Sequence, residues 1–201
     1  MKIRNIVKLS VILVVAILAA SFLNGIEYVL LVGAAAAIHE AGHIIAAKLL
    51  KVPSLGGGGT FFGLSLKYDF STSSFAAEAI VSASGAIAGV LACVITLAIK
   101  HPPGTYAVFF IFSNLSLALF NLLPVSPLDG SGIVRSLLSM VLSADAAERA
   151  SAWISAVFSL SFFVFCIYIQ LKVGANLSLM FISVFLLYNA LSTVRDVRGG
   201  Q

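Results

Sequence analysis

The sequence predicts an all-α protein that crosses a membrane about six times, and its composition is the first sign of this. Of the 201 residues, 60% are hydrophobic and 10% are charged, and the mean hydropathy is +1.09. Soluble domains usually carry about 25% charged residues, so this chain has too few charges to cover a water-facing surface. The second sign is a series of apolar stretches, each near the roughly 20 residues that a membrane-spanning helix needs. They cover residues 9–23, 28–50, 76–99, 106–123, 152–171 and 175–194.

The first apolar stretch follows a basic segment, residues 1–8, and this pattern is typical both of a signal peptide and of an uncleaved membrane anchor. Asn24 and Gly25 turn the chain directly into the next stretch, which favours the anchor. The basic residues then predict the orientation, because cytoplasmic loops carry an excess of Lys and Arg. With the N-terminus in the cytoplasm, all of the 12 Lys and Arg residues except Lys100 and Lys172 lie on the cytoplasmic side.

Two segments on that side interrupt the helical pattern. In residues 52–70, Pro53 ends the second helix and the glycine run 56–59 cannot sustain one, whereas residues 60–68 are typical of a short hairpin or extended strand. Extended backbone at membrane depth indicates an aqueous cavity nearby, although a flexible loop in the interface explains this composition equally well. The second segment, residues 121–132, holds two prolines and two glycines and precedes a short helix over residues 133–142.

An HExxH motif, His39-Glu40-Ala41-Gly42-His43, lies inside the second apolar stretch. Histidines four residues apart share one helix face, so their ring nitrogens can converge on one Zn²⁺. Glu40 can then accept a proton from the attacking water and pass it to the leaving nitrogen. Ionisable residues in a membrane span cost about 2.5 to 3.5 kcal/mol each, so a catalytic site explains this group better than helix-to-helix hydrogen bonds do.

A catalytic zinc ion takes three protein ligands, so one ligand is missing from the motif. Asp129 is the best candidate, because irregular backbone on the cytoplasmic side can aim a carboxylate inward. An aspartate before a glycine is also a common turn cap, and this alternative stays open. Of the other candidates, His101 and Glu27 lie on the opposite side of the membrane. Glu78 lies near the start of the third stretch, on the cytoplasmic side, and Asp145 and Glu148 lie in a polar linker.

The HEAGH motif, together with the segment FNLLPVSPLDG at residues 120–130, resembles the site-2 protease family of intramembrane zinc metalloproteases. The resemblance implies that His39, His43 and Asp129 bind one zinc ion and that Glu40 is the general base. It also implies that Asn121 helps to hold the substrate or stabilises the oxyanion, although an asparagine there can simply end a helix.

The resemblance further implies a catalytic core at about residues 26–142, within a single membrane protease domain that covers residues 1–201. Residues 82–86, SASGA, are similar to the family's small-residue stretch for close helix packing, but they lack the proline often found there. In size and six-span layout the chain is most similar to the minimal branch, which includes a sporulation protease that processes a pro-sigma factor.

The expected function is hydrolysis of a peptide bond in or near the transmembrane segment of a membrane-tethered regulator, such as a pro-sigma or anti-sigma factor. We expect a multi-pass protein of a bacterial cell membrane, with both termini and the active site towards the cytoplasm and with a membrane regulator or inhibitor as a further partner. Nucleic acid is not an expected partner, because the basic residues are scattered singly. The alternatives are a silent zinc-binding scaffold and a metal transporter, and the apolar outer halves of the spans disfavour the transporter.

Overall fold

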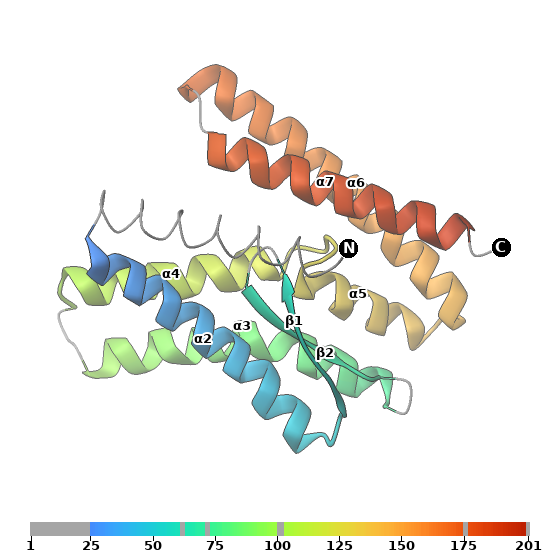
Figure 1. The fold of residues 1–201 in the computed structure, drawn as a ribbon, viewed down its shortest axis with the longest axis horizontal. Coiled ribbons are helices and arrows are strands. Elements are labelled where there is room, and N and C mark those ends of the chain that lie inside the picture. The colour runs from blue at the N-terminus through green and yellow to red at the C-terminus, as the bar shows by residue number, and fades with distance from the viewer. Residues whose placement is uncertain (1–24, 61–62, 71–72, 100–102, 175–176, 200–201) are drawn as a thin grey trace. The chain divides into compact units, whose positions relative to one another are not determined.

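A computed structural model describes residues 25–60, 63–70, 73–99, 103–174 and 177–199 of the chain. These residues form six helices and a two-stranded hairpin (Figure 1). The expected first span, residues 9–23, and the candidate ligand His101 lie outside the described residues. In chain order the elements are α2 (Ile26–Leu49), β1 (Ser54–Thr60), β2 (Gly63–Tyr68), α3 (Phe75–Ile99), α4 (Thr105–Asn121), α5 (Asp129–Ser139), α6 (Ala144–Val173) and α7 (Leu177–Gly199).

Four of the helices, α2, α3, α6 and α7, are long and apolar enough to cross a membrane. The shortest of these candidate spans has 22 residues, which at 1.5 Å per residue is about 33 Å and exceeds the hydrocarbon core of about 30 Å. Helix α4 is apolar as well, but it has only 17 residues. The prediction of a helical protein that is integral to the membrane is therefore confirmed.

The glycine-rich stretch after α2 forms the first strand of the hairpin. Helix α2 ends at Leu49, and Lys51 adopts a left-handed conformation with φ 56° that turns the chain away from the helix. Strands β1 and β2 are antiparallel, with Gly57 opposite Leu66 and Gly58 opposite Ser65. The Asp69 N–H donates to the Pro53 carbonyl at 2.8 Å and closes the base of the hairpin.

Two of the predicted boundaries were wrong. Helix α6 begins at Ala144, so Asp145 and Glu148 lie in its first turns and not in a linker. The alanines there favour a helix, and Asp145 in the first turn interacts well with the helix dipole. Helix α5 begins at Asp129 and not at residue 133. Gly130 lies within this helix, and a Cβ at its position would clash with the Leu122 carbonyl oxygen, so close packing requires a glycine there.

The described chain divides into two compact units. The first comprises the described residues up to 70 and residues 84–118, which include α2, the hairpin and most of α3 and α4. The second comprises residues 73–83 and the described residues from 119 onwards, which include α5, α6 and α7. Its apolar core contains Val125, Leu128 and Leu186, so α7 packs on the segment between α4 and α5.

Candidate metal centre

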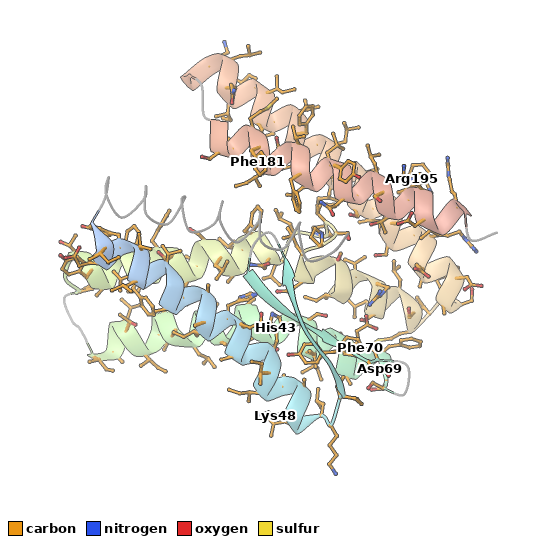
Figure 2. The ribbon with its side chains drawn as sticks, viewed as in Figure 1. His43, Lys48, Asp69, Phe70, Phe181 and Arg195 are labelled. Atoms are coloured by element: carbon orange, nitrogen blue, oxygen red, sulfur yellow. The ribbon has the colours of Figure 1, made fainter. Side chains whose placement is uncertain are left out.

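The two histidines of the HExxH motif lie next to each other on α2. Both are buried, with 8% and 7% of their surfaces exposed, and their Nε2 atoms are 3.3 Å apart. Zinc binds histidine nitrogen at about 2.0 to 2.1 Å with tetrahedral geometry, which places two nitrogen ligands about 3.3 to 3.4 Å apart. His39 and His43 therefore have the spacing of two ligands of one zinc ion. His43, labelled in Figure 2, lies in the C-terminal half of α2.

Helix α3 supplies two small residues beside these rings. The Ser84 Oγ lies 3.5 Å from Nδ1 of His43, so a hydroxyl contacts the ring nitrogen that faces away from Nε2. Contacts of this kind orient a ligating histidine and fix its tautomer. A Cβ at Gly85 would lie 2.4 Å from Nε2 of His43 and 2.7 Å from Nε2 of His39. Gly85 thus leaves open the space in front of both nitrogens.

Gly42, inside the motif, brings the two helices together. A Cβ at Gly42 would lie 2.5 Å from the Ser84 carbonyl oxygen and 2.8 Å from the Ala88 side chain. Such contacts between small residues let membrane helices approach closely. The sequence indicated close packing at residues 82–86, but only the structure shows that Gly85 faces the histidine nitrogens.

Glu40, the predicted general base, is half-buried on α2. Tyr68, the last residue of β2, belongs to the same unit, and its hydroxyl is buried. Burial raises the pKa of Tyr68, and the negative charge of Glu40 raises it further. The phenol therefore keeps its proton at neutral pH.

Asp129 and Asn121 belong to the second unit and flank the break between α4 and α5. Asn121 is the last residue of α4, as the helix-ending alternative expects. Asp129 is the first residue of α5, and the helix cap at Leu128 has no side-chain hydrogen bond. A carboxylate in the first turn of a helix interacts favourably with the helix dipole.

The segment between α4 and α5 is anchored to α6 and α7. The backbone N–H of Ser126 donates to the Ser155 Oγ at 2.8 Å, and the Thr193 hydroxyl lies 3.5 Å from the Ser126 hydroxyl. The Leu128 N–H donates to the Val125 carbonyl at 2.7 Å. These hydrogen bonds fix the backbone that leads into Asp129.

The remaining candidate ligands are placed less well for a metal. Glu78 is buried and forms an ion pair with Arg135, so its carboxylate already has a cationic partner. Asp145 and Glu148 are exposed on α6, and Glu27 is exposed in the first turn of α2.

Comparison with known proteins finds a family model that matches part of the chain and a solved structure with a similar fold. The family model described as peptidase family M50 matches residues 87–165, a range that contains Asn121 and Asp129 but not the HExxH helix. Among solved structures, a site-2 protease from Methanocaldococcus jannaschii is similar, with a TM-score of 0.68 and 20% sequence identity over 92% of this chain and 87% of that one. No curated protein matches the chain.

The two comparisons describe different properties of the chain. The similarity to the archaeal structure shows a shared fold over most of the chain, and the family match identifies a peptidase segment within it. The HExxH helix, which the family match does not cover, carries histidine nitrogens at zinc spacing. These observations agree with the resemblance found in the sequence: the chain shares the fold of a site-2 protease, and residues 87–165 match the model of peptidase family M50.

Proposed function

We propose that the chain is an intramembrane zinc metalloprotease that hydrolyses a peptide bond in or near the transmembrane segment of a membrane-tethered regulatory protein. The observation that carries this proposal is the pair of buried Nε2 atoms at 3.3 Å, with the space in front of them kept open by Gly85. The general base Glu40 is adjacent in sequence, on a helix long enough to span a membrane.

One zinc ion would be held by His39, His43 and Asp129. The three side chains form a set of ligand types that could hold a metal ion, and two imidazoles with one carboxylate leave a fourth position for water. When bound, zinc polarises the peptide carbonyl and lowers the pKa of water. This third ligand is part of the proposal and rests on the donor chemistry and on the family match to the segment around Asp129.

The chain's own side chains would perform the proton transfer. Glu40 takes the proton from the attacking water and delivers it to the leaving nitrogen, the usual role of a general base and acid. Asn121 would donate its amide N–H to the oxyanion of the tetrahedral intermediate. Loss of one such donor typically lowers the rate about 10² to 10³-fold.

The proposed topology has six spans. In addition to the four long helices, it includes residues 9–23 and α4, whose 17 residues lie at the lower limit for a span. Both termini and the active site face the cytoplasm of a bacterial cell membrane in this arrangement, which rests on the distribution of Lys and Arg. A membrane protein that regulates or inhibits the protease is proposed as a second partner, as in the minimal branch that the sequence resembles.

The experiment that tests the function compares Glu40→Gln with wild type. We expect the variant to bind zinc as wild type does and to leave membrane-tethered pro-sigma and anti-sigma candidates uncleaved in a co-expression assay. The control is Glu27→Gln, because Glu27 is exposed at the other end of the same helix and should leave cleavage unchanged.

An active Glu40→Gln protein would contradict the mechanism. If zinc-loaded wild type binds such candidates but never cuts them, the scaffold function is favoured instead. Zinc flux across proteoliposomes that requires His39 and His43 would indicate a transporter.

A further inference from the structure

Helix α5 carries the proposed zinc ligand Asp129 as its first residue, and it is a short helix. It has 11 residues, and helices of this length are marginally stable by themselves, so tertiary contacts decide where the helix lies. Asp129, Gly132 and Ser136 follow one another at spacings of three and four residues, which places them on one face of α5. Ser136 is fully buried on this face. The contacts of this side of α5 therefore determine the direction in which the Asp129 carboxylate leaves the helix.

Two successive turns of α5 contact the start of α3. A Cβ at Gly132 would lie 2.7 Å from the Ser82 Oγ, so the two helices approach each other closely here. Glu78 lies four residues before Ser82 on α3, and its carboxylate forms an ion pair with the guanidinium of Arg135 on α5. Contacts at two successive turns fix the separation of the helices and also the rotation of α5 about its own axis.

The two partners of the ion pair have different surroundings. Glu78 is buried, with 6% of its surface exposed, whereas 47% of the Arg135 side chain is exposed. A buried charge that loses its partner is strongly destabilising, so the Glu78 carboxylate depends on Arg135. If Glu78 were lost instead, water could still solvate the exposed guanidinium. The buried carboxylate on α3 therefore favours the position of α5 in which Arg135 reaches it.

Helix α3 also contacts the histidine pair, because it contributes residues to both compact units. In the first unit, the Ser84 Oγ lies 3.5 Å from Nδ1 of His43. In the second unit, Glu78 and Ser82 contact α5. The helix that carries the two histidines and the helix that carries Asp129 thus each have contacts with α3.

We propose that Glu78 and Arg135 are positioning residues for the proposed zinc site, because their ion pair fixes the rotation of α5 and thereby the direction of the Asp129 carboxylate. Neither residue touches the metal or the substrate in this role, and both act through α5. This inference rests on the proposed function, in which Asp129 is the third zinc ligand. Loss of groups that orient a metal ligand typically lowers metal affinity about 10 to 100-fold.

The test measures the zinc affinity of full-length protein, by competition with a chelating dye, and the Tm of the zinc-free form. Arg135→Met should lower zinc affinity about tenfold or more, and it should lower Tm because the Glu78 carboxylate stays buried without its cation. The double variant Glu78→Gln/Arg135→Met should recover most of the lost Tm, since no charge is left buried. Its zinc affinity should stay low, because the ion pair between α5 and α3 is still missing. Arg135→Lys should keep a high zinc affinity, because it keeps a cation opposite Glu78.

A second measurement reports the geometry of the metal ligands and uses Co²⁺ in place of zinc. The visible absorption of bound Co²⁺ depends on the number and arrangement of its ligands. At saturating Co²⁺, Arg135→Met and the double variant should show weaker and shifted bands relative to wild type, whereas Arg135→Lys should not. The matched control is Arg149→Met, which removes an exposed arginine from α6 in the same unit. It should keep the wild-type zinc affinity, Tm and Co²⁺ spectrum.

Three results would overturn the inference. The first is a wild-type zinc affinity or a wild-type Co²⁺ spectrum in Arg135→Met. The second is a zinc affinity that recovers together with Tm in the double variant, which would assign the ion pair a structural role alone. The third is an Asp129→Asn protein with wild-type zinc affinity, because Asp129 would then not be a ligand. If wild type binds zinc but cleaves nothing, the proposed protease function fails, and the zinc titrations still decide the role of the ion pair.

Discussion

At the residue scale, the absence of a side chain at Gly85 leaves space for a ligand beside the two buried histidines. The Nε2 atoms of His39 and His43 are 3.3 Å apart, and the space in front of them would be occupied by any larger residue at this position. Ser84 contacts His43 from the neighbouring position on α3. Consecutive small residues on one helix thus have separate tasks, one orienting a ring and the other leaving room for a ligand.

We predict that Gly85→Ala lowers zinc affinity at least tenfold and abolishes most of the activity. Its Cβ would lie 2.4 Å from Nε2 of His43, so it would displace the ring or block the metal. Changes to groups that contact metal ligands typically cost 10 to 100-fold in affinity. Zinc titration monitored by competition with a chelating dye measures this directly.

The matched control is Gly89→Ala, one turn further along the same helix. A Cβ there would lie 3.5 Å from the Asn114 carbonyl oxygen, which is an ordinary contact. If both variants lose zinc equally, helix packing and not the open space at Gly85 is responsible.

At the element scale, the break between α4 and α5 is held by hydroxyl groups of two membrane helices. Ser155 of α6 is 1% exposed and accepts the Ser126 N–H, and Thr193 of α7 contacts the Ser126 hydroxyl. Since α5 starts at Asp129, the position of this carboxylate depends on that anchor. The α6 and α7 helices thereby hold the backbone that leads into the first turn of α5.

We predict that Ser155→Ala destabilises the protein and weakens zinc binding together. An unpaired buried N–H costs about 1 to 3 kcal/mol, because the lost hydrogen bond is not replaced by water. Thermal unfolding and zinc titration are the measurements, and Ser155→Thr should rescue both, because it restores a hydroxyl. The control is Ser161→Ala on the same helix, whose hydroxyl is exposed and bonds only to its own helix at Val157. A Ser155→Ala protein with wild-type Tm would exclude the anchoring role.

At the scale of the whole molecule, charge placement predicts how the chain is oriented in the bilayer. Lys48 is exposed at the end of α2 and Lys172 is exposed at the end of α6. In the proposed orientation, which rests on the excess of basic residues, Lys48 is in the cytoplasm and Lys172 is on the opposite side. The described cysteines, Cys93 and Cys166, are both buried.

We predict that a membrane-impermeant maleimide added to intact cells labels Lys172→Cys and not Lys48→Cys, each in a background with Cys93→Ala and Cys166→Ala. Permeabilised cells should label both positions, which controls for accessibility. The reverse pattern in intact cells would invert the proposed orientation and place the active site on the outer face.

The sequence predicted the helices better than it predicted the connections between them. The apolar stretches 28–50 and 76–99 correspond within two residues to α2 and α3, because span length and hydropathy are local properties. The start of α5 was mispredicted, because Gly130 was interpreted as a helix breaker. Its actual role, contact with the Leu122 carbonyl, involves a neighbouring segment that no local pattern reveals.

The sequence by itself determined the class of the molecule and the chemistry of its centre. Hydropathy predicted membrane helices, and the four-residue spacing of His39 and His43 predicted a pair of metal ligands, since the helix period places both rings on one face. Tertiary structure decided what surrounds the pair: the open space at Gly85 and the contact from Ser84. These features join residues far apart in the chain, so they depend on how the backbone packs, which the spacing of residues along one helix does not encode.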